Sequence, residues 1–195
     1  MPYNLNNKLV IAISSRALFD LEEENQIFEK DGLDAYYKYQ LENEDKSLKK
    51  GTGYRLVENI LKINSFFSSD ERQVEVIILS KNNAATSLRI TNAINDLKLD
   101  IIRSAWTSGT NISNYLKAFK VDLFLSADDN DVLNAIENGV AAAKILPSNE
   151  NIHNSSNNQV RIAFDGDAVL FSEESELIYK NNGLDAFIEH EKLNK

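Results

Sequence analysis

Short apolar runs alternate with amphipathic segments along most of this chain, and this alternation restricts the possible folds more than any other feature. Apolar runs bounded by turn-forming residues predict strands at residues 9–13, 74–79, 100–106, 121–125 and 141–146. Helical spacing of apolar residues predicts helices at 54–67, 86–97, 114–119 and 131–139, and two short helices that meet near Gly32 within 20–40. Residues 42–53 are charged and flanked by glycine, which predicts a loop. This rhythm is typical of an α/β fold, a Rossmann-like parallel sheet flanked by helices.

Small polar clusters follow the predicted strands of the first 130 residues. Because ligands of open α/β sheets bind beyond the carboxyl ends of the strands, we expect these clusters to converge on one edge. Ser80 ends the second strand and is a candidate at that edge. The acidic run at 128–131 follows the fourth strand, and we interpret it as a helix N-cap with acidic residues that favour the helix dipole, not as a calcium loop.

Composition excludes several classes of function. The net charge of −9 argues against a nucleic-acid polymer as partner, although one local site can still bind a small anion. The chain has no cysteine, so it has no disulfide or thiolate metal site. No apolar run approaches the roughly 18 residues of a membrane helix, and the first residues lack the apolar core of a signal peptide. We therefore expect no membrane contact and a cytoplasmic location.

The segment 160–171 carries the strongest chemical signal. An apolar run, Val160–Phe164, predicts a buried strand, and Asp165-Gly166-Asp167 follows it before a second apolar run. Two carboxylates at i and i+2 project to the same side of extended backbone, an arrangement that suits one magnesium ion and one phosphoryl group. One carboxylate can attack phosphorus while the other transfers a proton. The alternative is a hairpin turn, because Asp-Gly is a common hairpin dipeptide.

An internal repeat favours the catalytic interpretation. Residues 11–39 and 162–190, offset by 151, share ten identities in 29 ungapped positions, among them Gly-Leu-Asp-Ala at 32–35 and 183–186. Ser14-Ser15-Arg16 stands in the first copy where Asp165-Gly166-Asp167 stands in the second. If Asp-Gly were only a hairpin turn, similar turn residues would be expected in the first copy, and they are absent there. A first copy that is a non-catalytic duplicate would be expected to lack the two carboxylates, as it does.

The repeat also predicts the domain organisation: a degenerate α/β domain at 1–147, a polar linker at 148–158, and the start of a catalytic-type copy at 159–195. Roughly 35 residues cannot bury a core alone. We therefore expect the second copy either to dock on the first or to continue in a longer protein.

These residues resemble the cytosolic type I 5′-nucleotidase family, within the haloacid-dehalogenase-like phosphatases. The resemblance covers nearly the whole chain. It rests on the segments 13–19, 115–119, 123–128, 163–172 and 183–185, together with 189–191.

The resemblance implies magnesium-dependent (Mg2+) hydrolysis of AMP- or IMP-type nucleoside 5′-monophosphates. It implies Asp165 as the nucleophile that becomes an aspartyl phosphate and Asp167 as the general acid, with both residues holding magnesium and Gly166 binding the phosphate. The family pattern also needs a Ser or Thr, a Lys and an acidic pair, which in this family lie after the Asp-Gly-Asp segment.

The first copy offers partial substitutes for these missing groups: Ser80, then Lys117 or Thr110-Asn111, then Ser126-Ala127 or Asp128-Asp129. For Lys117 we favour an ordinary position on an amphipathic helix over a role in phosphate binding. The alternative to an enzyme is a non-catalytic nucleotide-binding or oligomerisation module. In either case we expect a homo-oligomer, with Trp106 and the tyrosines near 36–39 in the core or in an interface.

Overall fold

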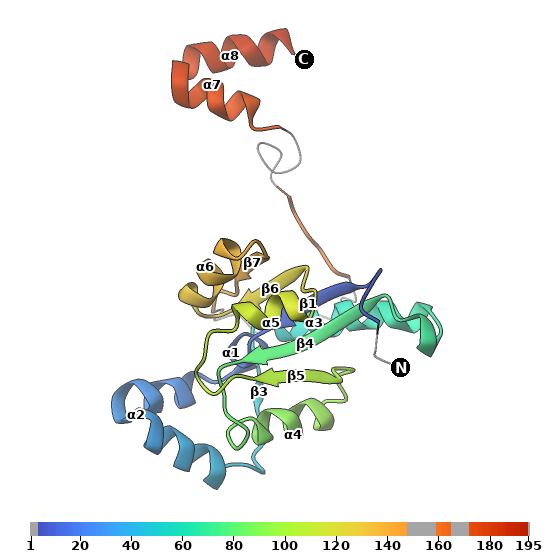
Figure 1. The fold of residues 1–195 in the computed structure, drawn as a ribbon, viewed down its shortest axis with the longest axis vertical. Coiled ribbons are helices and arrows are strands. Elements are labelled where there is room, and N and C mark those ends of the chain that lie inside the picture. The colour runs from blue at the N-terminus through green and yellow to red at the C-terminus, as the bar shows by residue number, and fades with distance from the viewer. Residues whose placement is uncertain (1–3, 148–158, 165–171, 195) are drawn as a thin grey trace. The chain divides into compact units, whose positions relative to one another are not determined.

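The computed structural model describes residues 4–147, 159–164 and 172–194 (Figure 1). The chain divides into two compact units, Met1–Asn158 and Gln159–Lys195. No helix in the described ranges has the length and apolar character that crossing a membrane requires.

Unit 1 is built on one five-stranded sheet in which all neighbouring strands are parallel. The central strand β1 is buried from Val10 to Ile13, and it pairs with β4 on one side and β6 on the other. The strands are β1 (Leu9–Ile13), β4 (Val74–Ser80), β5 (Arg103–Trp106), β6 (Leu123–Ser126) and β7 (Ala141–Lys144), in the order β5-β4-β1-β6-β7. The predicted Rossmann-like α/β class is confirmed.

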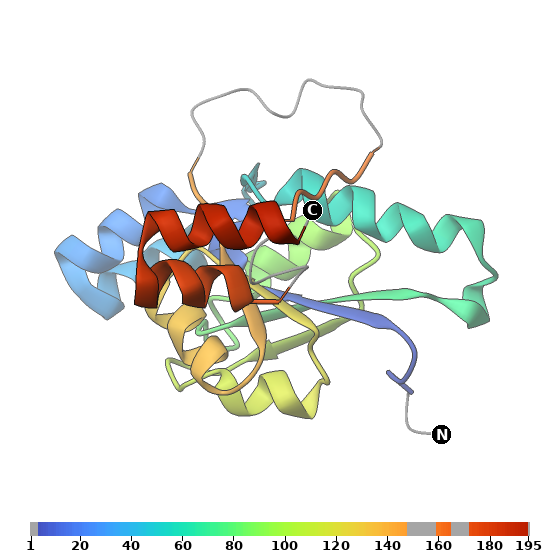
Figure 2. The same ribbon diagram turned by 90° about the horizontal axis from the view of Figure 1, so that it is seen from above.

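Helices cover both faces of this sheet, as the apolar periodicity predicts. Figure 2 shows α3 and α5 on opposite sides of the central strands. The predicted helix 54–67 changes character part-way, because the α-helix ends at Leu61 and a 3-10 turn, η1, continues to Phe66. The helices are α3 (Tyr54–Leu61), α4 (Leu88–Asp96), α5 (Ser113–Ala118) and α6 (Asp129–Glu137), with η1 (Lys62–Phe66) and a short 3-10 turn η2 (Ser69–Glu71).

The alternation of side chains along the strands divides the core between the two faces. One cluster joins Val10 and Ala12 of β1 and Ile77 of β4 to α5 and α6 through Leu116 and Ala135. Every member of this cluster is at most 8% exposed, so it excludes water from one side of the sheet. Such burial stabilises a domain by about 25 cal/mol per Å² of apolar surface.

The prediction that residues 42–53 form only a loop is wrong, because they include one strand of a small antiparallel strand pair. Strand β2 (Phe19–Asp20), which follows the one-turn helix α1 (Ser15–Leu18), pairs with β3 (Lys49–Lys50). Gly53 approaches the backbone so closely that an added Cβ would lie 2.6 Å from the Ala17 oxygen. The pairing is a tertiary contact that local composition does not reveal.

The helix α2 (Glu22–Glu42) is two helical arms joined at Gly32, which has φ 85° and ψ −176°. The predicted meeting of two helices near this glycine is confirmed. The conformation is essentially restricted to glycine, so Gly32 sets the angle between the arms.

Unit 2 contains α7 (Glu174–Asn182) and α8 (Leu184–Leu193), joined at Gly183. None of the described residues in these helices is buried. The strand predicted at 160–164 is not found: these residues form no ladder, and Ile162 and Phe164 are exposed. An apolar run becomes a strand only when another strand accepts its backbone hydrogen bonds, and within the described residues of unit 2 there is no strand to pair with it.

Candidate functional site

The carboxyl edge of the unit 1 sheet has its topological switch point between β1 and β6. Ser14 follows β1, and Ser126 is the last residue of β6. Ser126 Oγ donates a hydrogen bond to Ser14 Oγ over 3.3 Å, and both side chains are buried. Hydroxyl groups, not charged groups, therefore line the place where folds of this class bind ligands.

A second hydroxyl cluster lies beside the first, at the ends of β1 and β4. Ser15 Oγ and Ser80 Oγ are 2.9 Å apart. Asn82 Oδ1 accepts hydrogen bonds from both, over 3.0 Å from Ser15 and 2.7 Å from Ser80. The predicted convergence of the polar strand ends is thus present for Ser80, although its hydroxyl is engaged within the cluster.

Asn82 continues this cluster toward α2. Its Nδ2 donates to the Tyr36 hydroxyl over 2.8 Å, and Gln40 Nε2 donates to the same hydroxyl over 3.0 Å. Burial raises the pKa of the Tyr36 phenol above its ordinary value, although these two donors act to lower it. Tyr36 therefore remains a neutral phenol that ties the α2 hairpin to the sheet edge.

Beyond Tyr36 lies a buried ion pair. Arg89 of α4 donates to Glu24 Oε1 over 2.6 Å and to Gln40 Oε1 over 3.3 Å from one guanidinium nitrogen. Its Nε donates to the Lys46 carbonyl over 3.0 Å. The arginine thus joins both arms of α2 to α4.

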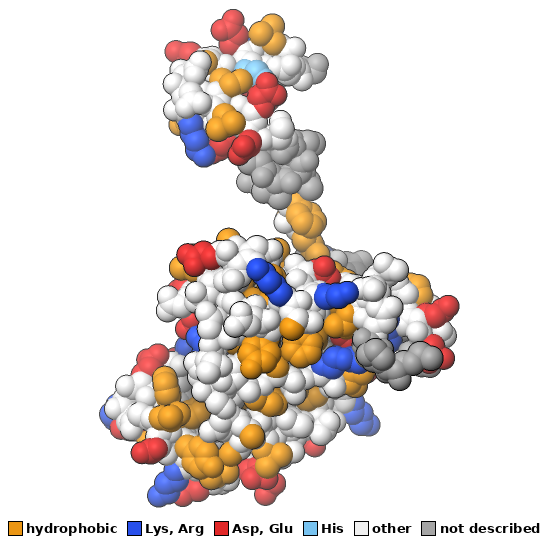
Figure 3. All heavy atoms as spheres, viewed as in Figure 1, with side chains coloured by type: hydrophobic (Ala, Val, Ile, Leu, Met, Phe, Trp, Pro, Cys, Tyr) orange, Lys and Arg blue, Asp and Glu red, His pale blue; other side chains and the backbone are white. Residues whose placement is uncertain are grey.

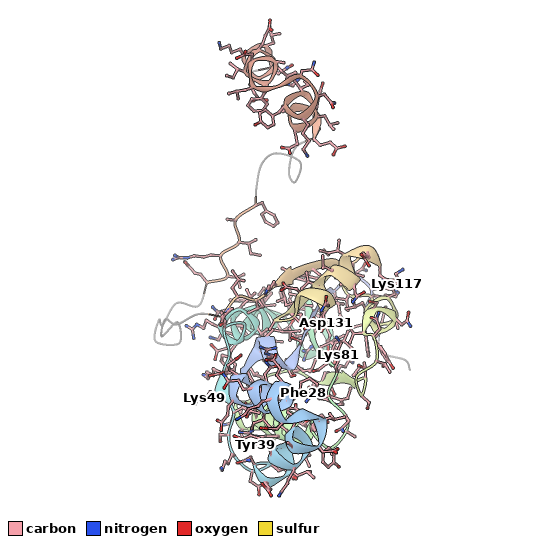
Figure 4. The ribbon with its side chains drawn as sticks, turned by 90° about the vertical axis from the view of Figure 1, so that its left-hand side faces the viewer. Phe28, Tyr39, Lys49, Lys81, Lys117 and Asp131 are labelled. Carbon is pink, nitrogen blue, oxygen red and sulfur yellow. The ribbon has the colours of Figure 1, made fainter. Side chains whose placement is uncertain are left out.

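The carboxylates near this edge are also engaged. Lys81 Nζ lies 2.5 Å from Asp131 Oδ1, and the two side chains point toward one another in Figure 4. Burial nevertheless raises the pKa of the Asp131 carboxyl above its ordinary value, against the lowering influence of Lys81. Asp128 accepts from the Asp131 backbone N–H over 3.0 Å, which confirms the predicted helix N-cap. Asp129 pairs with Lys144 over 2.7 Å.

These contacts define what the edge of unit 1 can do chemically. Its serines bind one another and Asn82, whereas its aspartates bind lysines or cap α6. Within the residues that the structure describes, no group of three or more His, Asp or Glu side chains is arranged to hold a metal ion. Among the described residues of this edge, Asp131 and Asp129 are paired with lysines and Asp128 caps α6.

The other predicted site residues lie apart from this edge. Lys117 is exposed in the last turn of α5, where its charge favours the helix C-terminus, and Figure 4 places it away from Lys81. Because α5 returns the chain toward the amino ends of the strands, the topology does not bring Lys117 to Ser80. Asp165, Gly166 and Asp167 lie outside the described residues. The catalytic and metal-binding roles of Asp165 and Asp167 stay predictions, as does phosphate binding by Gly166, Ser80 and Lys117.

Comparison with known proteins identifies the family. A protein-family model described as 5′-nucleotidase matches residues 1–195. Human cytosolic 5′-nucleotidase 1B is 35% identical over 196 aligned residues, which cover 98% of this chain. The chain belongs to the cytosolic type I 5′-nucleotidase family. It spans about a third (32%) of the length of that human relative.

The end of β1 differs from the matching segment of the second copy in the residues that could do chemistry. At the offset of 151, Ser14 stands where the second copy has Asp165, and Arg16 stands where it has Asp167. The structure places Ser14 as the N-cap of α1 and pairs Arg16 with Glu22 over 3.2 Å. The first copy thus has hydroxyl and guanidinium groups at the positions where the second has carboxylates.

Sequence reasoning missed Asn82, Tyr36 and Arg89 as members of this edge. Arg89 carried a signal in the sequence, because it lies four residues before Ala93, one of the residues that mark one face of the predicted helix 86–97. A lone cation at such a position indicates a buried ion pair. Its partners, on a helix more than forty residues away in sequence, carried no such signal.

Proposed function

We propose that this protein is a 5′-nucleotidase that hydrolyses AMP- or IMP-type nucleoside 5′-monophosphates through Asp165 and Asp167. The observation that carries the proposal is the match of the whole chain to the 5′-nucleotidase family. The carboxylates at the unit 1 edge are already engaged, which leaves the Asp165-Gly166-Asp167 segment as the candidate for the chemistry.

The proposed reaction has two steps with balanced charges and protons. The Asp165 carboxylate attacks phosphorus, the bond to the 5′-oxygen breaks, and the Asp167 carboxyl donates its proton to that oxygen. The Asp167 carboxylate then accepts a proton from water as the water oxygen attacks phosphorus, the bond between phosphorus and the Asp165 oxygen breaks, and inorganic phosphate and the Asp165 carboxylate are released. A bound magnesium ion supplies neutralisation of the phosphoryl charge, and the oxygen atoms of Asp165 and Asp167 are the ligand type that it prefers.

Phosphate release from AMP and IMP, with and without magnesium, tests this proposal. We compare the chain with its Asp165→Asn and Asp167→Asn variants, and with Asp34→Asn as the matched control on an exposed face of α2. We expect magnesium-dependent release that Asp165→Asn abolishes, that Asp167→Asn reduces at least about a hundredfold, and that Asp34→Asn leaves unchanged.

Two outcomes contradict the proposal. Release that survives Asp165→Asn means that another group is the nucleophile. A folded chain that binds AMP without releasing phosphate favours the alternative, a non-catalytic nucleotide-binding module. A cytoplasmic location and a homo-oligomeric state stay predictions beside this proposal.

A further inference from the structure

Two asparagine–glycine bonds occur in this sequence, Asn138-Gly139 after α6 and Asn182-Gly183 between α7 and α8. At such a bond the backbone nitrogen of glycine can attack the side-chain amide of asparagine, because glycine has no Cβ to obstruct the approach. The attack closes a cyclic imide and releases ammonia, and water then opens the imide to aspartate or isoaspartate. The sequence makes both bonds suitable for this deamidation, so a difference between them comes from the fold.

The fold engages both reacting groups of Asn138-Gly139. Asn138 Nδ2 donates to the Asn134 carbonyl over 2.8 Å. The Gly139 N–H, which is the attacking group, donates to the Ile136 carbonyl over 2.8 Å. The next N–H, that of Val140, donates back to α6 over 3.0 Å, and Val140 is only 7% exposed in the core cluster. The imide can form only when these bonds open together and Val140 moves with them.

Fewer contacts hold Asn182-Gly183. The Gly183 N–H donates to the Tyr179 carbonyl over 2.9 Å. The side chain of Asn182 forms no hydrogen bond to any residue that the structure describes. Asn182 is also the last residue of α7, and helix ends fray. Opening one hydrogen bond at the end of α7 therefore frees both reacting groups.

The first copy already carries the product of this reaction at the equivalent position. At the offset of 151, Asp31-Gly32 within α2 stands where Asn182-Gly183 stands in the second copy. The two glycines share one conformation, since Gly32 has φ 85° and ψ −176° and Gly183 has φ 84° and ψ −178°. An aspartate with the ordinary backbone link is therefore compatible with this type of helical hairpin.

Isoaspartate differs at this junction, because its link runs through the side-chain carbon and adds a CH2 group to the backbone. Aromatic rings span the glycine in both hairpins. Phe28 and Tyr36 meet edge-on at 5.9 Å between ring centroids, and Tyr179 and Phe187 meet edge-on at 6.1 Å. An extra backbone atom between Tyr179 and Phe187 displaces one ring from the other and weakens this contact. Figure 3 shows that the surface of the α7–α8 hairpin already carries acidic side chains, to which either product adds a carboxylate.

We propose that Asn182 is a site of spontaneous deamidation in the folded chain, whereas Asn138 is protected. The aspartyl product keeps the α7–α8 hairpin, and the isoaspartyl product disrupts it.

The reaction at Asn182 consumes one water molecule and releases one ammonia. A base removes the proton of the Gly183 N–H, the nitrogen forms a bond to Asn182 Cγ, and the bond from Cγ to Nδ2 breaks as ammonia leaves with that proton. Water then adds to one of the two imide carbonyl carbons. Cleavage of the bond from Gly183 N to Cγ gives aspartate. Cleavage of the bond from Gly183 N to the backbone carbonyl carbon of Asn182 gives isoaspartate.

The test incubates the complete chain at mildly alkaline pH without nucleotide and follows deamidation by mass spectrometry of its peptides. Fragmentation by electron transfer distinguishes aspartate from isoaspartate. We expect Asn182 to deamidate roughly tenfold or more faster than Asn138 in the folded chain, because Asn138 has to break additional hydrogen bonds. In concentrated urea the two positions should react at comparable rates, because only the fold separates them.

Two variants serve as controls. Asn182→Asp should match the unmodified chain in amide hydrogen exchange across α7 and α8. The aged chain should gain a faster-exchanging population in these helices, in proportion to its isoaspartate. Asn181→Gln, a change next to the site, should leave the rate at Asn182 unchanged.

Equal rates at Asn138 and Asn182 in the folded chain overturn the proposal, as does a folded chain in which neither position reacts. Fast exchange across α7 and α8 in the Asn182→Asp chain also overturns it, because the aspartyl product would then not keep the hairpin. No outcome depends on phosphate release, so the proposed function is tested separately.

Discussion

Replacing Arg89 by methionine should destabilise unit 1 strongly, because the guanidinium of Arg89 is the only cation that the structure places on the buried carboxylate of Glu24 within the described residues. Methionine keeps the aliphatic stem of the side chain but removes the contacts to Glu24, Gln40 and the Lys46 carbonyl. Breaking one partner of a buried ion pair costs about 3–5 kcal/mol, since the remaining charge stays desolvated. We expect a loss of this size in the free energy of unfolding.

Urea unfolding measures this loss through the fluorescence of Trp106, the single tryptophan, which lies in β5 of unit 1. With a denaturant dependence of about 1–3 kcal/mol per molar urea, the midpoint should fall by more than about 1 M. Arg16→Met is the matched control, because Arg16 forms an exposed ion pair with Glu22, a type worth about 0–1 kcal/mol.

The double variant Glu24→Gln with Arg89→Met separates the buried charge from lost packing. Removing both charges leaves neutral groups in the same place, so the double variant should recover a large part of the lost stability. The reasoning is refuted if Arg89→Met lowers the midpoint no more than Arg16→Met does. It is also refuted if the double variant is as unstable as Arg89→Met alone, because the buried charge would then not be the cause.

Three further changes test other parts of unit 1. Gly53→Ala should cost about 1–3 kcal/mol in chemical unfolding, because the new Cβ would lie 2.6 Å from the Ala17 oxygen; an unchanged midpoint would contradict this close approach. Asp128→Ala should cost about 1 kcal/mol by removing the N-cap of α6, whereas Asp128→Asn keeps an acceptor and should cost less; equal losses would argue against capping. Burial raises the pKa of Tyr54 to about 12, so Tyr54→Phe should delete a late step in the phenolate absorbance titration. The native state keeps the Tyr54 proton to a higher pH than the unfolded chain does, so the free energy of unfolding should fall as the pH rises from about 10 to about 12. A Tyr54→Phe chain with an unchanged absorbance titration would refute the assignment.

The sequence determined the features that depend on neighbouring residues. Apolar runs and helical spacing indicated the five strands and main helices of unit 1, because a residue's face along a strand or helix follows from its position alone. The kink at Gly32 and the Asp128 cap were predictable for the same reason: a glycine-restricted backbone and a side chain bonded three residues ahead are local. The family was also recognisable, since its motifs are short contiguous segments.

Only the tertiary structure decided which distant residues meet. It decided the strand order, the pairing of β2 with β3, the contact of Arg89 with Glu24, and the absence of a ladder at 160–164. The same is true of Ser80, whose place at the strand end was predictable but whose bonds to Ser15 and Asn82 were not. Hydrogen bonds and ion pairs between distant segments depend on how whole elements pack against one another. The sequence pattern predicts which face of a helix or strand is buried, but it does not predict which distant residues that face contacts.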